Sequence, residues 1–145
     1  MILSKISLKY RVFIPPSIRD EIGILLDLSK LDKYWTIKSP DYTKSIPALA
    51  IKEYISNLRI RLDKALRIAE EAVKSQNPYE ESIKNLRQKF RTYVRNGILD
   101  SVADLDCIIL AYQENAILIT SDIGMIKFGE NLGLSYIIAE NIIND

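Results

Sequence analysis

The chain has no histidine and only one cysteine, Cys107, among its 145 residues. The absence of histidine excludes Ser-His-Asp and Cys-His triads, imidazole acid-base catalysis and imidazole-bound zinc. A single cysteine excludes a disulfide framework and a thiolate zinc site, which favours a reducing, cytoplasmic location. Any catalysis must therefore rest on carboxylates, lysine, tyrosine or a metal ion.

Glycine and long apolar runs are also scarce. The five glycines are scattered, so the chain has no glycine-rich phosphate loop, and nucleotide-cofactor enzymes are disfavoured. No apolar stretch approaches the ~20 residues that a membrane helix needs, and the N-terminus lacks a signal-peptide hydrophobic region. With 48% hydrophobic and 27% charged residues, we expect one soluble globular domain over residues 1–145.

Basic and acidic residues are sorted along the chain, although the formal net charge is only +1. Between residues 44 and 95 basic residues outnumber acidic ones two to one, whereas residues 96–145 hold one basic residue, Lys127, among eight acidic ones. Lysine and arginine neutralise phosphates, while clustered carboxylates repel nucleic acid unless cations bridge them. This sorting suits a nuclease.

The basic segment has the apolar spacing of a helical hairpin. Pro47 is expected near the first turn of a long helix, residues 77–78 supply a turn, and Gly97 is expected to end the second arm. Extra apolar positions at Leu66 and Val73 leave surface for a partner subunit. The two arms are expected to pack through residues spaced by three and four, Ile51, Ile55, Leu58, Leu62, Ala65, Ala69 and Ala72 with Tyr79, Ile83, Leu86, Phe90 and Tyr93.

Basic side chains decorate this hairpin. They form either a solvated helical face, supported by pairs such as Arg67 with Glu71 at i, i+4, or a surface that contacts RNA. Both interpretations stay open from the residues alone. The candidate RNA-binding residues are Arg59, Arg61, Lys64, Arg67, Lys84, Arg87, Lys89, Arg91 and Arg95.

Four aspartates cluster in the last third of the sequence. Asp100, Asp104 and Asp106 lead into a helix expected to begin at Ser101, and Asp122 follows a short expected strand. Ligands of open parallel sheets gather at the carboxyl ends of strands, so these aspartates are candidate catalytic residues and cation ligands. In a regular helix Asp106 is rotated by about 200° from Asp104 and should face elsewhere. Asp104 and Asp122 are also candidate helix caps.

The N-terminal third predicts a strand followed by a helix. Residues 10–14 are expected to form a short strand that ends at two prolines. Ser17 is expected to cap a helix through Leu28, with Asp20 as its capping-box partner. A second extended piece is expected near Trp35, and we assign no chemistry to this region.

These segments together resemble the PIN-domain nucleases. More narrowly, the chain resembles HARP, the minimal protein-only ribonuclease P enzymes, and the similar archaeal RNA ligase partner proteins. The resemblance spans nearly the whole chain. The residues that carry it are 13–17 (FIPPS), 45–49 (SIPAL), 69–72 (AEEA), 98–106 (ILDSVADLD), 110–111 (LA), 118–122 (LITSD) and Gly133.

The resemblance implies an α/β fold, a PIN-like domain with a central parallel sheet and an inserted basic helical hairpin at residues 44–95. An acidic metal-site half follows at residues 98–138. The implied substrate is precursor tRNA, from which water would release the 5′ leader while the hairpin grips the folded tRNA body. The implied assembly is a homo-oligomer formed through the hairpin.

The resemblance also assigns residues to the implied metal site. Asp100, Asp104 and Asp122 match the family's acidic positions, Asp106 lies close by, and Glu21 matches an acidic position on an early helix. The implied cofactor is Mg²⁺ or Mn²⁺, which would activate a water and polarise the scissile phosphate.

The chain departs from the family pattern at its start. PIN domains open with a strand that carries a metal-binding aspartate followed by Thr or Ser, and nothing before Tyr10 matches. Ile2 to Lys5 resembles the helix that would follow such a strand, so an N-terminally shortened form is expected. Three alternatives stay open: another PIN-type RNA-processing nuclease, an RNA ligase partner, and a non-catalytic RNA-binding or assembly form.

Overall fold

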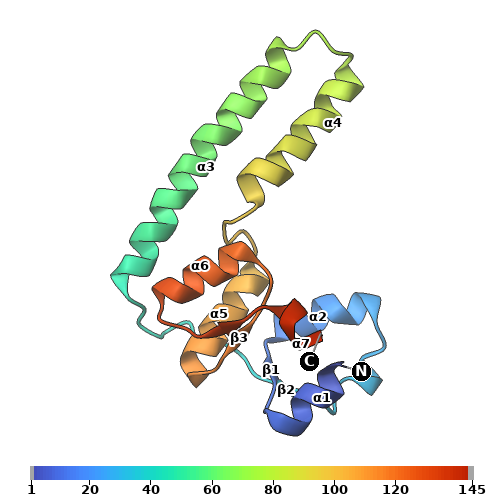
Figure 1. The fold of residues 1–145 in the computed structure, drawn as a ribbon, viewed down its shortest axis with the longest axis vertical. Coiled ribbons are helices and arrows are strands. Elements are labelled where there is room, and N and C mark those ends of the chain that lie inside the picture. Colours follow the sequence, from blue (N-terminus) through green and yellow to red (C-terminus); the bar gives the residue numbers. More distant parts are fainter. Residues whose placement is uncertain (1, 144–145) are drawn as a thin grey trace.

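The computed structural model describes residues 2–143, a sequence of short strands and mostly longer helices (Figure 1). No helix in this described range is both long and apolar enough to cross a membrane. The elements in chain order are α1 (Ile2–Lys9), β1 (Phe13–Ile14), α2 (Pro16–Leu25), η1 (Leu28–Lys30), β2 (Thr36–Ile37), α3 (Ala48–Lys74), α4 (Tyr79–Phe90), η2 (Arg91–Arg95), α5 (Val102–Glu114), β3 (Leu118–Ile119), α6 (Ile123–Asn131), β4 (Tyr136–Ile137) and α7 (Ala139–Ile143).

The strands form two separate parallel pairs. In the first, β1 pairs with β2 and Phe13 stands opposite Thr36; in the second, β3 pairs with β4 and Leu118 stands opposite Tyr136. Each pair is joined through a helix, α2 or α6, as parallel strands require. The expected α/β class is confirmed. Within the described residues, however, the parallel sheet consists of two-stranded pairs rather than one continuous sheet.

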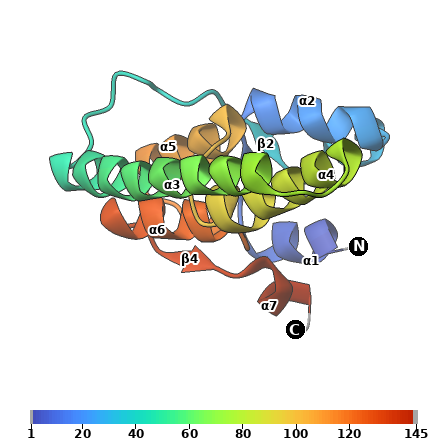
Figure 2. The same cartoon turned by 90° about the horizontal axis from the view of Figure 1, so that it is seen from above.

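The helices α3 and α4 form the expected hairpin, which projects from the rest of the molecule (Figure 1). Seen from above, it overlies the part of the molecule that holds α5 and α6 (Figure 2). Pro47 precedes α3 and Pro78 precedes α4, both with extended ψ angles. Proline suits these positions because it lacks the N–H that a helix start leaves unbonded. The second arm continues as the π-helical turn η2, and Gly97 beyond it has the positive φ of 88° that glycine tolerates.

Only part of the apolar seam expected on α3 faces inward: Leu58, Ala65, Ala69 and Ala72 are half-buried. Ile51, Ile55 and Leu62 were assigned to internal packing, yet they are 42%, 57% and 59% exposed. Ile68, which lies about 100° further around the helix, is instead buried. Alanines dominate the C-terminal half of the predicted seam, whereas the three exposed aliphatic side chains lie in its N-terminal half.

The core lies around α5. Ile108 is fully buried at its centre, and α5 contacts α2, α6, β1 and β3. The base of α3 joins this core through Tyr54, whose ring meets that of Phe128 edge to face at 5.8 Å between centroids. The hairpin is therefore anchored at its base by packing against α6.

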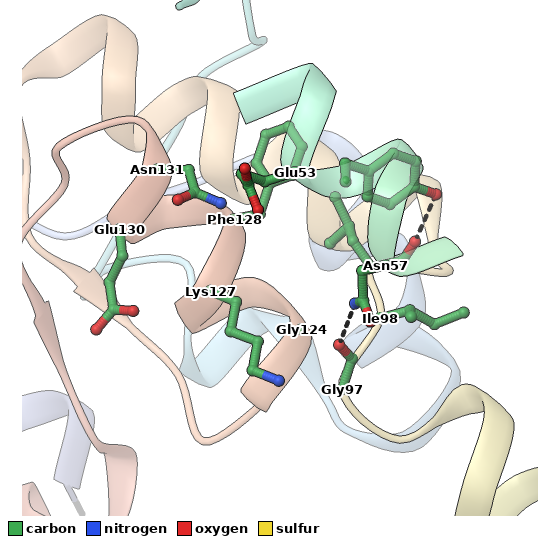
Figure 3. A pocket seen from close by; sticks show the side chains of 11 residues that line it. Glu53, Asn57, Gly97, Ile98, Gly124, Lys127, Phe128, Glu130 and Asn131 are labelled. Carbon is green, nitrogen blue, oxygen red and sulfur yellow. Dashed lines mark hydrogen bonds between the residues drawn. The ribbon is translucent and has the colours of Figure 1, made fainter. Parts of the chain in front are cut away.

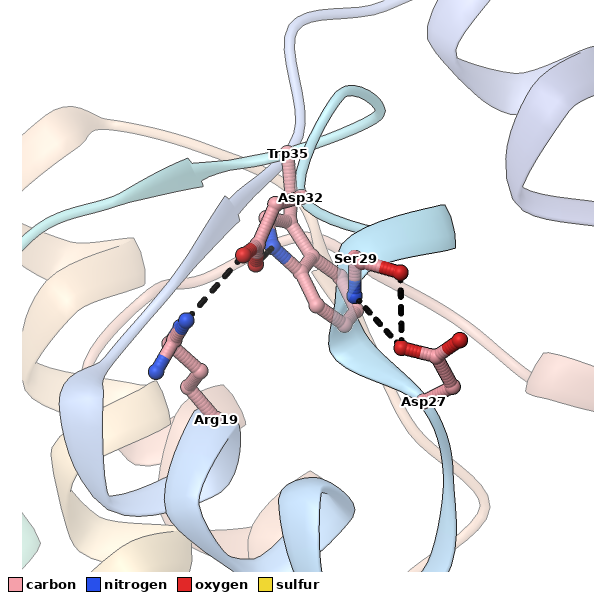
Figure 4. Close-up of polar contacts among 5 residues, drawn as sticks. All are labelled: Arg19, Asp27, Ser29, Asp32 and Trp35. Atoms are coloured by element: carbon pink, nitrogen blue, oxygen red, sulfur yellow. Dashed lines mark hydrogen bonds and ion pairs between the residues drawn. The ribbon is translucent and has the colours of Figure 1, made fainter.

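Polar contacts hold α2 to the segment that follows it (Figure 4). Arg19 Nη2 donates to Asp32 Oδ2 at 3.0 Å, and the buried Trp35 donates its indole N–H to Asp32 Oδ1 at 3.0 Å. The predicted helix start was wrong in detail. The N-cap of α2 is Pro15, whose side chain has no hydrogen-bonding atom, and Ser17 donates to a distant aspartate on α5.

Candidate active site

Asp104 lies half-buried in the first turn of α5. Burial raises the pKa of its carboxyl, and the charges of Asp122, Asp100 and Glu21 raise it further. No hydrogen bond or ion pair engages this side chain within residues 2–143. Of the four carboxylates that the sequence assigned to a metal site, Asp104 therefore lies close enough to the other three to be affected by their charges.

Asp122 is positioned by the end of β3 and the start of α6. Its Oδ1 accepts from Met125 N at 2.8 Å, so Asp122 is the N-cap of α6 as the sequence predicted. Its own N–H donates to Thr120 Oγ1 at 3.1 Å. Within residues 2–143, no hydrogen bond or ion pair engages the second carboxylate oxygen of Asp122, so this oxygen can bind another ligand.

Asp100 lies at the end of the segment that joins the hairpin to α5. Its carboxylate accepts from Arg95 Nε, and the two side chains form an ion pair. Arg95 was predicted to contact RNA, and here it neutralises one of the predicted metal ligands. The last basic residue of the hairpin is thus linked to the acidic group.

Carboxylate oxygens suit hard divalent cations, and a cation would relieve the repulsion that raises the pKa of Asp104. Within residues 2–143, no three Asp, Glu or Cys side chains stand close enough to hold a metal ion together. The donor types fit Mg²⁺ or Mn²⁺, with Asp104 and the free oxygen of Asp122 as the nearest anchors. Asp100 would join them only after leaving Arg95.

Asp106 lies apart from this group, on the buried side of α5, and is 5% exposed. Its Oδ2 accepts from Ser17 Oγ and its Oδ1 from Tyr42 Oη, each at 2.6 Å. The hydrogen bond to Asp106 raises the pKa of the Tyr42 hydroxyl. The catalytic role assigned to Asp106 stays a prediction, and these contacts favour a role in joining α5 to α2 and to the loop before α3.

The thiol of Cys107 is unsuited to catalysis. Burial raises its pKa to about 12, and the neighbouring charges of Asp104, Asp106 and Glu21 contribute. The thiol therefore stays protonated at neutral pH, in keeping with the exclusion of thiolate chemistry.

The segment before Asp100 is held by three side chains of α3: Tyr54 and Asn57, which the sequence did not single out, and Arg61, which was predicted to contact RNA. Tyr54 Oη donates to the carbonyl of Leu99 at 3.0 Å, Asn57 Nδ2 to that of Gly97 at 3.1 Å, and Arg61 Nη1 to that of Tyr93 at 2.8 Å. We call these three residues the α3 clamp.

The opposite side of this segment packs against α6. A Cβ added at Gly124 would overlap the backbone carbonyl of Ile98 and stand 2.9 Å from Leu99 N. Glycine therefore permits the two backbones to touch at this point. The segment that carries Asp100 is fixed between the α3 clamp and the start of α6, where Asp122 lies.

Three of the predicted RNA-binding residues share a groove between the hairpin arms. Lys64, Arg67 and Lys89 line it, with Asp63 and Glu71 as counter-charges, around a volume of about 630 Å³. Lys89 Nζ pairs with a Glu71 oxygen at 3.0 Å. RNA binding by the hairpin stays a prediction. Further predicted residues are exposed on its surface: Arg59, Lys84, Arg87 and Arg91.

The sequence profile of the PINc domain ribonucleases matches residues 1–144. This chain belongs to that family. The resemblance to PIN-domain nucleases is confirmed, and with it the expectation of an endoribonuclease. PIN nucleases generally use divalent metals.

Similar curated proteins are named RNA-free ribonuclease P. The one from Ignicoccus hospitalis is 38% identical over an alignment of 149 residues, which covers 94% of this chain and 73% of the relative. The protein from Thermodesulfovibrio yellowstonii is 39% identical over 135 residues, 88% of this chain and 69% of the relative. The one from Pyrococcus furiosus is 32% identical over 136 residues, and the match covers 89% of this chain and 68% of the relative. The narrower resemblance to HARP is confirmed by these matches.

Proposed function

We propose that this chain is a protein-only ribonuclease P, an endonuclease that removes the 5′ leader of precursor tRNA. The observation that carries the proposal is the family membership together with the group of mutually repelling carboxylates at Asp104. The names of the relatives favour this activity over an unspecialised nuclease and over an RNA ligase partner.

The carboxylates would act as the cation site of this reaction. Asp104 and Asp122 would hold Mg²⁺ or Mn²⁺, and Asp100 would complete the set on release from Arg95. Such a cation supplies Lewis-acid chemistry, lowering the pKa of a water and polarising the scissile phosphate. Arg95, once free, can neutralise a phosphate oxygen of the substrate. The charge of Glu21 acts least on Asp104 among the three neighbouring carboxylates.

The basic hairpin would grip the tRNA body. Structured RNA is recognised mostly through its shape and phosphates, which suits cations spread along two helices better than reading of bases. A cytoplasmic location follows from a tRNA-processing role and stays a prediction.

We further infer that the hairpin mediates self-association. Five exposed apolar side chains of α3 fall within about 60° of one another around the helix and extend over roughly 33 Å. An exposed apolar stripe of this length is typical of an interface. We call this the outer stripe, formed by Ile51, Ile55, Leu62, Leu66 and Val73.

The decisive test is cleavage of a leader-bearing precursor tRNA with and without Mg²⁺ or Mn²⁺, with mapped product ends. We expect one cut that releases the leader, lost in Asp104→Asn and retained in Asp20→Asn, a matched change at an exposed position of α2. An unfolded RNA of the same sequence around the cut should stay intact. Cleavage of both RNAs would indicate another PIN-type nuclease, and binding without cleavage would indicate a non-catalytic form.

A further inference from the structure

Two cationic side chains from distant parts of the chain meet at Gly97. Arg61 Nη2 is 3.2 Å and Lys127 Nζ is 3.8 Å from the point where a Cβ at Gly97 would stand, so the two nitrogens are at most about 7 Å apart. Arg61 comes from α3, and Lys127 from α6 is the one basic residue of the acidic final third. Because like charges at this separation repel, an anion between them would be stabilised.

Neither cation is neutralised by a neighbour. Within residues 2–143, no carboxylate lies in ion-pair range of either side chain. Arg61 donates Nη1 to the Tyr93 carbonyl, and its Nη2 is left for another acceptor. The nearby carbonyl of Gly97 accepts from Asn57.

A cavity opens beside this pair. It has a volume of about 280 Å³, and the side chain of Lys127 extends across it toward Gly97 (Figure 3). Glu53 and Glu130 also line the cavity and lower its affinity for anions. The cavity therefore suits a ligand whose single negative charge lies at the Gly97 end, rather than a polyanion that fills the whole cavity.

We propose that Arg61 and Lys127 bind one phosphodiester group of the substrate RNA. This inference rests on the proposed function and adds to it a phosphate site beside the acidic group. Two charge-assisted hydrogen bonds of about 2.7–2.9 Å to different oxygens of one phosphate can span the separation of the two nitrogens. Gly97 leaves the space for this phosphate, because a side chain there would meet Arg61.

The location gives the site a positioning role. Gly97 is three residues from Asp100, within about 10 Å of extended chain, and Lys127 is five residues along α6 from Asp122, about 7.5 Å of helix rise. A phosphate held at Gly97 fixes the RNA strand a short distance from the carboxylates. The hairpin cations hold the tRNA body, whereas this pair holds the strand near the cut.

The test is binding of precursor tRNA across a KCl series without divalent cations, so that cleavage does not interfere. For Lys127→Gln we expect the affinity for RNA to fall about three- to ten-fold at low salt. The salt slope, which is the slope of log affinity against log KCl concentration, should become less steep by about one. Lys30→Gln, a matched loss of charge at an exposed position of η1, should leave the slope unchanged. Glu130→Gln should strengthen binding. In cleavage assays Lys127→Gln should raise KM and leave kcat nearly unchanged.

Each contrary result overturns this phosphate site without deciding the proposed activity. Equal salt slopes for Lys127→Gln and Lys30→Gln, or wild-type protein that binds no RNA, would reject it even if cleavage occurs. Inorganic phosphate at constant ionic strength could protect the Lys127 amine from an amine-modifying reagent. If it does so while Lys127→Gln leaves the salt slope of RNA binding unchanged, the site takes small anions only. Conversely, a changed slope with no leader release would keep the phosphate site and reject the ribonuclease P activity. Melting temperatures verify that each variant is folded.

Discussion

Two buried glycines in α6 allow a matched test of how the acidic segment is held. Gly124 touches the backbone of Ile98 and Leu99, so an alanine there must displace backbone. Gly129 has room, since an added Cβ would stand 3.5 Å from Leu118 Cδ2, an ordinary contact distance. We therefore expect Gly124→Ala and Gly129→Ala to change stability in opposite directions.

The magnitudes follow from the two local environments. Alanine in place of helical glycine stabilises by about 0.4–1 kcal/mol where the backbone conformation is compatible, which we expect for Gly129→Ala. Overpacking typically costs about 1–3 kcal/mol, and backbone yields less easily than a side chain, so Gly124→Ala should destabilise by roughly 2 kcal/mol net. The difference of roughly 3 kcal/mol corresponds to about 6–12 °C in Tm.

Denaturant unfolding and cleavage assays on both variants measure the effect. We expect Gly124→Ala to reduce cleavage more than RNA binding, because it pushes the segment that carries Asp100 away from α6. Gly129→Ala should retain both. Equal stability of the two variants would refute the idea that close backbone contact at Gly124 fixes this segment.

Three other outcomes follow from the same contacts. Because the pKa of Asp104 is raised on folding, the folded state holds a proton that the unfolded state releases, and the free energy of unfolding falls as pH rises from the unfolded-state pKa through the folded one. Asp104→Asn should therefore abolish cleavage yet raise the metal-free Tm at pH 7; an unchanged Tm would contradict the repulsion. Tyr42→Phe leaves the buried Asp106 with one partner and should lower the free energy of unfolding measured with denaturant, with kcat retained. Leu62→Glu in the outer stripe should lower the mass of the oligomer measured by light scattering. Tyr79→Glu, a matched change at an exposed position at the start of α4, should leave that mass unchanged.

The sequence could predict the features that local signals determine. Pro47 and Pro78 mark the starts of α3 and α4 because proline restricts its neighbours in any context. Asp122 caps α6 through a bond to a residue three positions away. The rotation of Asp106 away from Asp104 follows from helix geometry alone.

The errors arise where distant residues compete for a side chain. Ser17 was expected to cap its own helix, but Asp106, 89 positions away, accepts its hydroxyl. The face of α3 that packs on α4 could not be chosen from spacing, because an alanine-rich seam and an aliphatic seam both have helical periodicity. The α3 clamp could not be predicted either, because its acceptors are backbone carbonyls, which every residue has. Lys127 did carry a signal, as a lone cation in an acidic segment.

The contacts at residues 93–99 explain how a gripping hairpin and an acidic site can work together. The α3 clamp bonds to this segment at three points, and the segment ends at Asp100. Side-chain to backbone bonds fix the position of the segment whatever residues it contains, so they hold Asp100 in a set position relative to the hairpin base. An RNA held by the hairpin would then meet the acidic group at a constant distance. A distance fixed in this way would select the cut by its separation from the tRNA body, which requires no contact with the bases at the cut.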